Sequence, residues 1–144
     1  MTLIEGMQTN SKQFFTPFSL CEISAKAMFG DFSSVKKAVK DKGYITLSEP
    51  ASGSGAMIIA ARNLLASHGY GTDNLYVVND ISAICYHMTY IQLSLLGIVG
   101  QVCWGNTITG EIWERTMTSP YFFSQFPILF RLEKALEGMK PTAG

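Results

Sequence analysis

The sequence predicts an α/β fold of the Rossmann-like type, in which a mainly parallel sheet lies between helical layers in a three-layer sandwich. Three observations predict it: β-rich runs at 44–48, 75–80 and 98–104, helical periodicity between them, and a glycine-rich turn after the first run. Strands that alternate with helices form parallel sheets through right-handed crossovers. With 144 residues, of which 47% are hydrophobic, the chain has the size of one domain with its own core.

The first predicted helix begins near Ser19, a residue type that favours the N-cap position, and ends at Gly30. Its apolar residues recur at helical spacing: Leu20, Ile23, Ala27 and Met28. A shorter helix over 33–41 precedes the first strand, and a helix over 56–67 follows the glycine-rich turn.

The second half of the chain continues the alternation and then loses it. Ser82 can cap a long helix over 83–96, which leads to the third strand. Residues 107–118 are polar and mixed, so they predict no buried element. Residues 124–137 have the pattern of a closing amphipathic helix.

Composition sets limits on partners. We expect a single domain over residues 13–138, between a flexible N-terminal arm at 1–12 and a frayed tail at 139–144. Lys+Arg and Asp+Glu both number 11, so the net charge is zero and no basic excess predicts nucleic-acid binding. Any DNA contact is then local or supplied by a partner subunit. The longest apolar run, at 90–99, is far shorter than the roughly 20 residues needed to cross a bilayer, so we expect no membrane contact.

The cysteines and histidines predict no metal or disulfide framework. Cys21, Cys85 and Cys103 are odd in number, widely spaced and set in apolar segments, which is typical of buried, reduced thiols in a cytoplasmic protein. His68 and His87 have no Cys or Asp at ligand spacing, so we expect no metal site.

The segment Glu49 to Gly55, E-P-A-S-G-S-G, carries the strongest functional pattern. It joins a predicted strand to a predicted helix by a tight turn. Gly53 and Gly55 can take positive φ and let a ligand lie against the backbone, while the helix that starts near Ala56 directs free N–H groups into the same space. The pattern therefore predicts a cradle for a nucleotide-like cofactor, with an ordinary βα turn as the alternative.

Polar residues also end the other two predicted strands. Ligands of open parallel sheets bind outside the carboxyl ends of the strands. Asp80 ends the second strand and can accept both hydroxyls of a ribose, and Ile81 beside it can cover one face of an adenine. Asn106 ends the third and offers a donor and an acceptor to the adenine edge. The alternative for Asp80 is that it caps the following helix.

Two features distinguish between cofactors. The dinucleotide pattern G-x-G-x-x-G is not met, because Ile58 stands where the third glycine belongs. Glu49 would repel a phosphate and favours an amino group. An adenosine that carries an amino acid fits both observations, and S-adenosylmethionine is such a molecule.

Four segments in this order resemble the adenine-amino DNA methyltransferases of the type I modification-subunit kind. Residues 49–55 resemble their first S-adenosylmethionine motif, D-P-x-C-G-S-G, and Asn79-Asp80-Ile81 with the helix after it resembles their second. Gly105-Asn106-Thr107-Ile108 is similar to their G-D-S/T-L element. Upstream, Gln13-Phe14-Phe15-Thr16-Pro17 matches their Q-F-Y/F-T-P segment, which in that family closes over the methionine end of the cofactor.

The resemblance implies a class I S-adenosylmethionine-dependent methyltransferase fold, truncated relative to the family. It implies that Glu49 contacts the ammonium group, Thr16 the carboxylate end, Asp80 the ribose and Asn106 the adenine. Gly53 and Gly55 would lie against the methionine part. The full set of expected cofactor-binding residues is Phe15, Thr16, Pro17, Glu49, Pro50, Ala51, Gly53, Gly55, Asp80, Ile81 and Asn106. Thr16 and Pro17 could instead simply initiate the first helix.

The catalytic motif of that family, N/D/S-P-P-Y/F, should end a fourth strand. The candidate here is Ser119-Pro120-Tyr121-Phe122, in which Ser119 would accept from the target amino group and Phe122 would stack on a flipped base. Tyr121 replaces the second proline, and residues 111–117 before it are too polar for a buried central strand.

Two functions therefore follow from the sequence. The first is methyl transfer from S-adenosylmethionine to the adenine amino group of DNA, with DNA bound directly or through a partner subunit. The second is a catalytically inactive module that binds the cofactor or a partner and regulates DNA methylation or restriction. The aromatic residues at 121–126 further suggest a surface for a homo- or hetero-oligomer.

Overall fold

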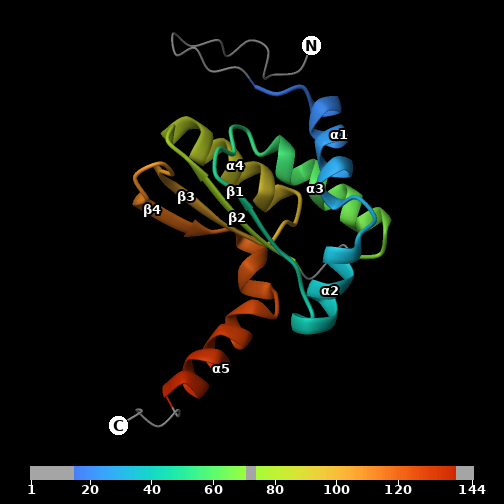
Figure 1. Cartoon of the computed structure of the whole chain (residues 1–144). Helices are drawn as coiled ribbons and strands as arrows, with labels where there is room; N and C mark the ends of the chain where they lie inside the picture. The colour runs from blue at the N-terminus through green and yellow to red at the C-terminus, as the bar shows by residue number, and fades with distance from the viewer. Residues whose placement is uncertain (1–14, 71–73, 139–144) are drawn as a thin grey trace.

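The computed structural model describes residues 15–70 and 74–138. The N-terminal arm and the C-terminal tail predicted from the sequence lie outside these residues. The elements, in chain order, are α1 (Phe18–Phe29), α2 (Ser33–Lys42), β1 (Thr46–Glu49), α3 (Ala56–Ser67), β2 (Leu75–Asp80), α4 (Ala83–Leu95), β3 (Gly100–Asn106), β4 (Glu111–Met117), the 3₁₀ helix η1 (Ser119–Phe123) and α5 (Phe126–Gly138). Figure 1 shows their arrangement.

One sheet in the order β1-β2-β3-β4 organises the domain. The first three strands are parallel, and Leu47 pairs with Tyr76 and Val78 with Val102. The predicted α/β class and the mainly parallel sheet are confirmed. β4 instead runs antiparallel to β3, because a short turn joins them and leaves no room for a crossover.

The helices do not form the two outer layers that the sequence predicts. The helices α1, α3 and α4 all cover the face of the sheet that carries Leu47, Tyr76 and Val78. On the opposite face, Leu75 and Val77 contact only η1 and the first turns of α5, and α5 then extends away from the sheet (Figure 1). Within the described residues the arrangement is therefore one helical layer on one face, with partial cover on the other.

The apolar stripe predicted for α1 faces the wrong way. Leu20, Ile23 and Met28 are exposed, whereas Cys21, Ala25 and Phe29 are buried. The small side chains at the buried positions let α1 approach the alanines of α3 closely, and packing decides the buried face rather than apolar spacing.

The polar run before the predicted catalytic motif is the edge strand β4, most of whose residues are exposed. Its hairpin turn is closed by Asn106, whose Oδ1 accepts from the N–H groups of Ile108 (3.0 Å) and Thr109 (3.3 Å). Gly105 is required here, because a Cβ at this position would collide with the carbonyl oxygen of Glu111.

Three further sequence expectations concern the interior and the surface. All three cysteines are buried, as predicted. Among the described residues, no three His, Cys, Asp or Glu side chains gather as a metal site would require. In the same part of the chain, every helix is too short or too polar to cross a membrane.

Candidate cofactor site

Two pockets lie at the carboxyl ends of β1, β2 and β3. The first, here called the turn pocket, has a volume of about 270 Å³ and is lined by Phe15, Thr16, Cys21, Glu49, Gly53 and Met57, among others. The second, the hairpin pocket, has about 410 Å³ and is lined by Pro50, Ala51, Asp80, Ile81, Asn106 and Ile108, together with Gly105 and Thr107. Ala51 lines both, so the pockets meet at the β1–α3 loop.

The glycine turn has the conformation that the sequence predicts. Gly53 has φ +54° and Gly55 has φ +88°, both in the region that favours glycine. A Cβ at Gly53 would project toward the ring of Phe15, 3.7 Å away, and so into the turn pocket. The backbone of the turn is thus bare on the side where a ligand can approach.

The first turn of α3 brings backbone N–H groups to the same pocket. Gly55 is the N-cap residue, and no side chain caps the helix. Ala56 and Met57, which open the helix, line the turn pocket. Backbone N–H groups at a helix N-terminus bind anionic groups such as carboxylates.

Glu49 supplies negative charge to the turn pocket. Its Oε1 accepts from the N–H of Ala51 at 3.0 Å, which fixes the carboxylate at the end of β1. Cys21 lies nearby, and burial first and the Glu49 carboxylate second raise the pKa of its thiol, so this sulfur stays neutral. Among the described residues no Lys or Arg lines either pocket, so the Glu49 carboxylate favours a cationic group beside it.

Asp80 joins the glycine turn to the end of β2. Its Oδ2 accepts from the N–H of Gly53 and its Oδ1 from that of Ser82, both at 2.8 Å. Ser82, and not Asp80, is the N-cap of α4, and its Oγ accepts from the N–H of Cys85. An ionised carboxylate has about four acceptor positions, so Asp80 can still accept from a ligand in the hairpin pocket.

The far wall of the hairpin pocket differs from the prediction in one respect. The Oδ1 of Asn106 is engaged in the β3–β4 turn, so only its NH₂ group remains for a ligand. Two largely exposed side chains, Ile81 and Ile108, flank the pocket and offer apolar surface to a planar ring. Trp104 fixes the first of them, because its Nε1 donates to the carbonyl of Ile81 at 3.0 Å.

Comparison with models of known protein families identifies the family of the chain. The family model described as N-6 DNA methylase matches residues 4–128. The chain belongs to the N-6 DNA methylase family. The resemblance noted in the sequence is thereby confirmed. No curated protein and no solved structure matches the chain.

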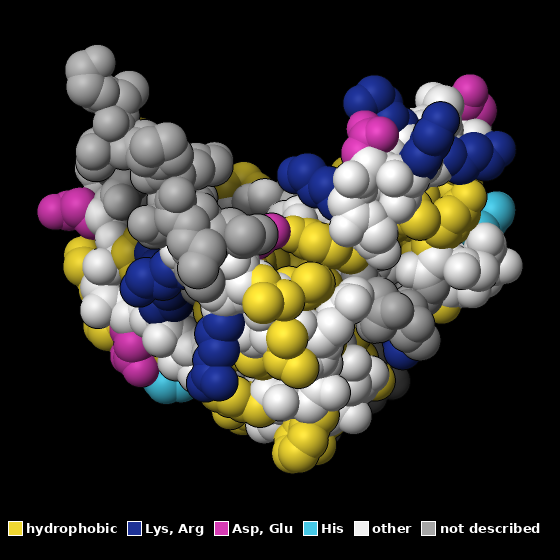
Figure 2. Space-filling model, turned by 90° about the horizontal axis from the view of Figure 1, so that it is seen from below, with side chains coloured by type: hydrophobic (Ala, Val, Ile, Leu, Met, Phe, Trp, Pro, Cys, Tyr) yellow, Lys and Arg dark blue, Asp and Glu magenta, His cyan; other side chains and the backbone are white. Residues whose placement is uncertain are grey.

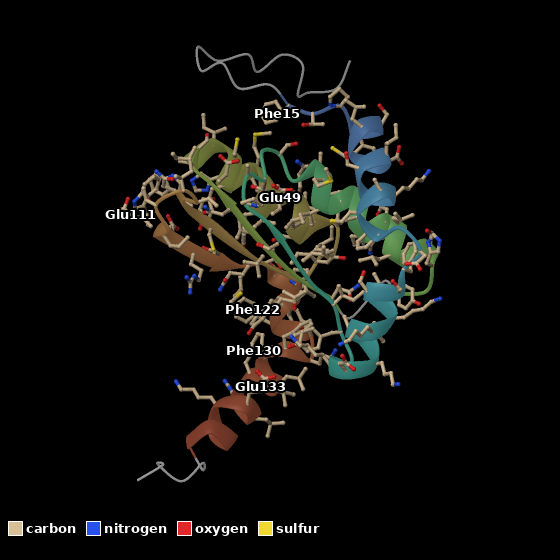
Figure 3. All side chains as sticks on the ribbon, in the orientation of Figure 1. Phe15, Glu49, Glu111, Phe122, Phe130 and Glu133 are labelled. Carbon is tan, nitrogen blue, oxygen red and sulfur yellow. The ribbon has the colours of Figure 1, made fainter. Side chains whose placement is uncertain are left out.

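The predicted catalytic residues of this family member lie away from the pockets. Because β4 runs antiparallel, Ser119, Pro120, Tyr121 and Phe122 follow its end at the amino ends of the parallel strands. Figure 3 shows Phe122 below the sheet, Glu49 at the upper end of β1 and Phe15 above it. The backbone N–H of Ser119 donates to Ser94 at the end of α4, at 3.4 Å. This segment and the two pockets therefore lie at opposite ends of the parallel strands.

Several residues that hold the site together were not among the predicted ones. Thr89 of α4 is fully buried, and its Oγ1 donates to the carbonyl of Gly53 at 3.0 Å. Gln92, one turn later, donates to the carbonyl of Ser54. The signal was present in the sequence, since these two polar residues stand three positions apart, on one face of a helix without Asp, Glu, Lys or Arg.

A second brace joins the loops around the hairpin pocket. Thr107 donates through Oγ1 to the carbonyl of Pro50 at 2.7 Å and accepts from the Nδ2 of Asn79. The same Nδ2 lies 3.2 Å from the carbonyl of Gly105. The three loops at this end of the sheet are thus held in register before any ligand binds.

Proposed function

We propose that this N-6 DNA methylase family member binds S-adenosylmethionine across the turn pocket and the hairpin pocket. The observation that carries the proposal is the pairing of groups around the glycine turn. A fixed carboxylate, an uncapped helix N-terminus and a bare positive-φ backbone meet in the turn pocket, and a second carboxylate stands in the adjoining pocket. An amino acid joined to a nucleoside carries the complementary groups.

The amino acid end fits the turn pocket. Glu49 can accept from the ammonium, and the N–H groups at the start of α3 can donate to the carboxylate together with Thr16. Gly53 and Gly55 allow the methionine part to lie close to the backbone, and Phe15 covers it from the other side. Pro17 sets the entry to α1 just after this segment.

The nucleoside end fits the hairpin pocket. Asp80 can accept from the ribose hydroxyls, and the NH₂ group of Asn106 can donate to an adenine ring nitrogen. Ile81 can cover one face of the ring. Pro50 and Ala51 shape the wall between the two pockets.

The chemistry of the bound cofactor is the transfer of its sulfonium methyl group to a nucleophile. The residues of this chain would act by holding the donor in one orientation and by excluding water from its methionine end, since positioning supplies much of the acceleration in such a reaction. The negative charge of Glu49 and Asp80 also favours a cationic ligand over a neutral one.

We propose DNA adenine as the acceptor, in keeping with the family. Two forms of this function remain distinct: transfer by this chain, and a cofactor-binding module that acts with a partner subunit. The position of Ser119 to Phe122 at the opposite end of the sheet favours the second form, because no described residue at the pockets replaces that acceptor motif.

The lysines of α2 form a local group of positive charge, and this group does not lie beside the pockets. The helix α2 carries four exposed lysines, of which Lys37 is paired with Asp41 at 2.7 Å. Figure 2 shows several basic side chains on one projection of the surface and others elsewhere on the same face. This helix precedes β1 and so lies toward the amino ends of the strands, away from the cofactor pockets.

Calorimetry and a methyl-transfer assay test the proposal together. We expect the wild-type protein to bind S-adenosylmethionine, and Glu49→Gln to bind it at least about tenfold more weakly, because the charge that attracts the ammonium is lost. Glu111→Gln, in the β3–β4 hairpin, is the matched control and should bind as the wild type does. Absence of binding at millimolar cofactor would contradict the proposal.

The transfer assay then separates the two forms. Labelled methyl transfer to unmethylated DNA that is unaffected by Phe122→Ala indicates an enzyme whose acceptor site lies elsewhere in the chain. Tight binding without transfer indicates the module. Transfer abolished by Phe122→Ala, with cofactor binding intact, would contradict the placement of this segment away from the reaction.

A further inference from the structure

The helix α4 presents an apolar stripe on the side that points away from the sheet. Ile84, Met88, Ile91 and Leu95 follow one another at intervals of 4, 3 and 4 residues, which places them along one side of the helix. Ile84, Ile91 and Leu95 are exposed by half or more, and Met88 is half-buried.

The other side of the same helix is already buried. Cys85, Tyr86, Thr89 and Leu93 pack toward the sheet and the glycine turn. No Asp, Glu, Lys or Arg occurs anywhere in Ala83–Leu95. Of the exposed residues of α4, which are Ile84, His87, Ile91 and Leu95, only His87 is polar, so the outward stripe is an exposed apolar surface of the kind that marks an interaction site.

The other exposed apolar helices differ in this respect. The outward side of α1 includes Glu22 and Lys26 beside its exposed apolar residues. The exposed side chains of α5 include Arg131, Glu133 and Lys134. Charges of this kind keep a surface helix in water, and α4 is the only described α-helix that lacks them.

The spacing of the stripe fits a second copy of itself. The intervals 4, 3 and 4 are the same in both directions, so a two-fold axis between Met88 and Ile91 brings the helix antiparallel to its own copy in register. Ile84 then faces Leu95 of the second copy, and Met88 faces Ile91. Intervals that alternate between three and four are those by which two helices pack along a common seam.

Charge raises no barrier to this pairing. An isologous contact brings every charge of the surface close to its own copy, which is costly when the surface is charged. The stripe has no charged residue, and the whole chain has a net charge of zero. A strongly charged partner would find no complement on it.

We propose that the protein forms a two-fold dimer in which α4 of one copy packs antiparallel against α4 of the second along Ile84, Met88, Ile91 and Leu95. The helix is about 20 Å long, at 1.5 Å per residue. A seam of this length is small for a permanent dimer, so the association depends on protein concentration.

Dimerisation is separable from cofactor binding. The residues of α4 that hold the glycine turn, Thr89 and Gln92, are not members of the stripe. A substitution on the stripe therefore tests the dimer without altering the groups that line the pockets.

Sedimentation velocity over a range of protein concentrations tests the proposal on the whole chain. We expect a concentration-dependent species of twice the 15.8 kDa chain mass. Ile91→Glu should weaken it by about a hundredfold, because each of the two copies loses the burial of one isoleucine side chain, worth about tenfold or more.

A matched control substitution uses the same residue type on another helix. Ile23 of α1 is 62% exposed and Ile91 is 54% exposed, so Ile23→Glu makes the same change at a similar surface position. It should leave the dimer as it is. Circular dichroism of both variants establishes that the monomer fold persists.

Charge pairing tests the register itself. Leu95→Glu alone should weaken the dimer, and the same chain with Ile84→Lys added should recover at least part of the loss, because each new lysine faces a new glutamate of the second copy. In a second double variant, Ile84→Lys with Ile91→Glu, the new lysine does not face the new glutamate of the second copy. This variant should not recover the lost dimer affinity.

Four outcomes would overturn the proposal. They are a monomer at every concentration, a dimer that resists Ile91→Glu, a dimer broken equally by Ile23→Glu, or an assembly that grows beyond two copies.

Discussion

The substitution Gly53→Ala tests the role of the glycine turn in ligand binding, provided that its effect on binding is separated from its effect on backbone strain. The φ of +54° at Gly53 costs an alanine about 1–2 kcal/mol in the folded state. For a chain of this size, that cost lowers the Tm by roughly 3–8 °C. The added methyl would also project into the turn pocket toward Phe15, whose ring lies 3.7 Å from the new carbon, so it would not clash with the protein but would occupy the space of a ligand.

Gly43 provides the control. It ends α2 with φ +81°, and a Cβ there would meet nothing within 4 Å. We expect Gly53→Ala and Gly43→Ala to lower the Tm by similar amounts in thermal unfolding. Only Gly53→Ala should also weaken S-adenosylmethionine binding in calorimetry, by about tenfold or more. The reasoning is refuted if both variants lose affinity equally, or if Gly53→Ala binds as tightly as the wild type.

Three further substitutions test other parts of the account. Thr89→Val removes the buried hydroxyl that donates to the carbonyl of Gly53, and should destabilise the protein by about 1–3 kcal/mol in denaturant unfolding and weaken cofactor binding; unchanged affinity would show that this brace is not needed. Gly105→Ala should prevent the β3–β4 hairpin from closing, because the new Cβ would overlap the carbonyl of Glu111, and a wild-type Tm would contradict this. Burial raises the pKa of Tyr76 from 10.0 to about 12, so the folded state keeps a proton that the unfolded chain loses above pH 10. The corresponding stability is complete below pH 10 and is lost as the pH rises from 10 to 12, and Tyr76→Phe should remove this loss in unfolding measured at pH 8 and pH 11.

The local parts of the fold and site could be predicted from the sequence. The turn from Glu49 to Gly55 is specified by neighbouring residues, since glycines that need positive φ stand directly between a strand and a helix. The position of Asp80 at the end of β2 follows from the same local pattern. Because β1 and β2 are parallel neighbours, the glycine turn after β1 and Asp80 at the end of β2 lie at the same edge of the sheet.

The parts that depend on packing could not be predicted in this way. Apolar spacing in α1 does not reveal that Cys21 and Ala25 face the core, because the close approach of α3 favours small side chains there. The direction of β4 depends on the turn that Asn106 and Gly110 close, and the polar pattern of residues 107–118 does not reveal that turn. The position of the predicted catalytic segment follows from that single turn, since an antiparallel strand carries Ser119 to the end of the sheet opposite the two pockets.

A crystal structure of the protein with S-adenosylmethionine or its demethylated product tests the central claim most directly. We expect the amino acid end in the turn pocket, with its ammonium against Glu49, and the adenosine in the hairpin pocket between Asp80 and Ile81. A ligand bound elsewhere, or one reversed so that its adenine lies against Phe15, would contradict the account.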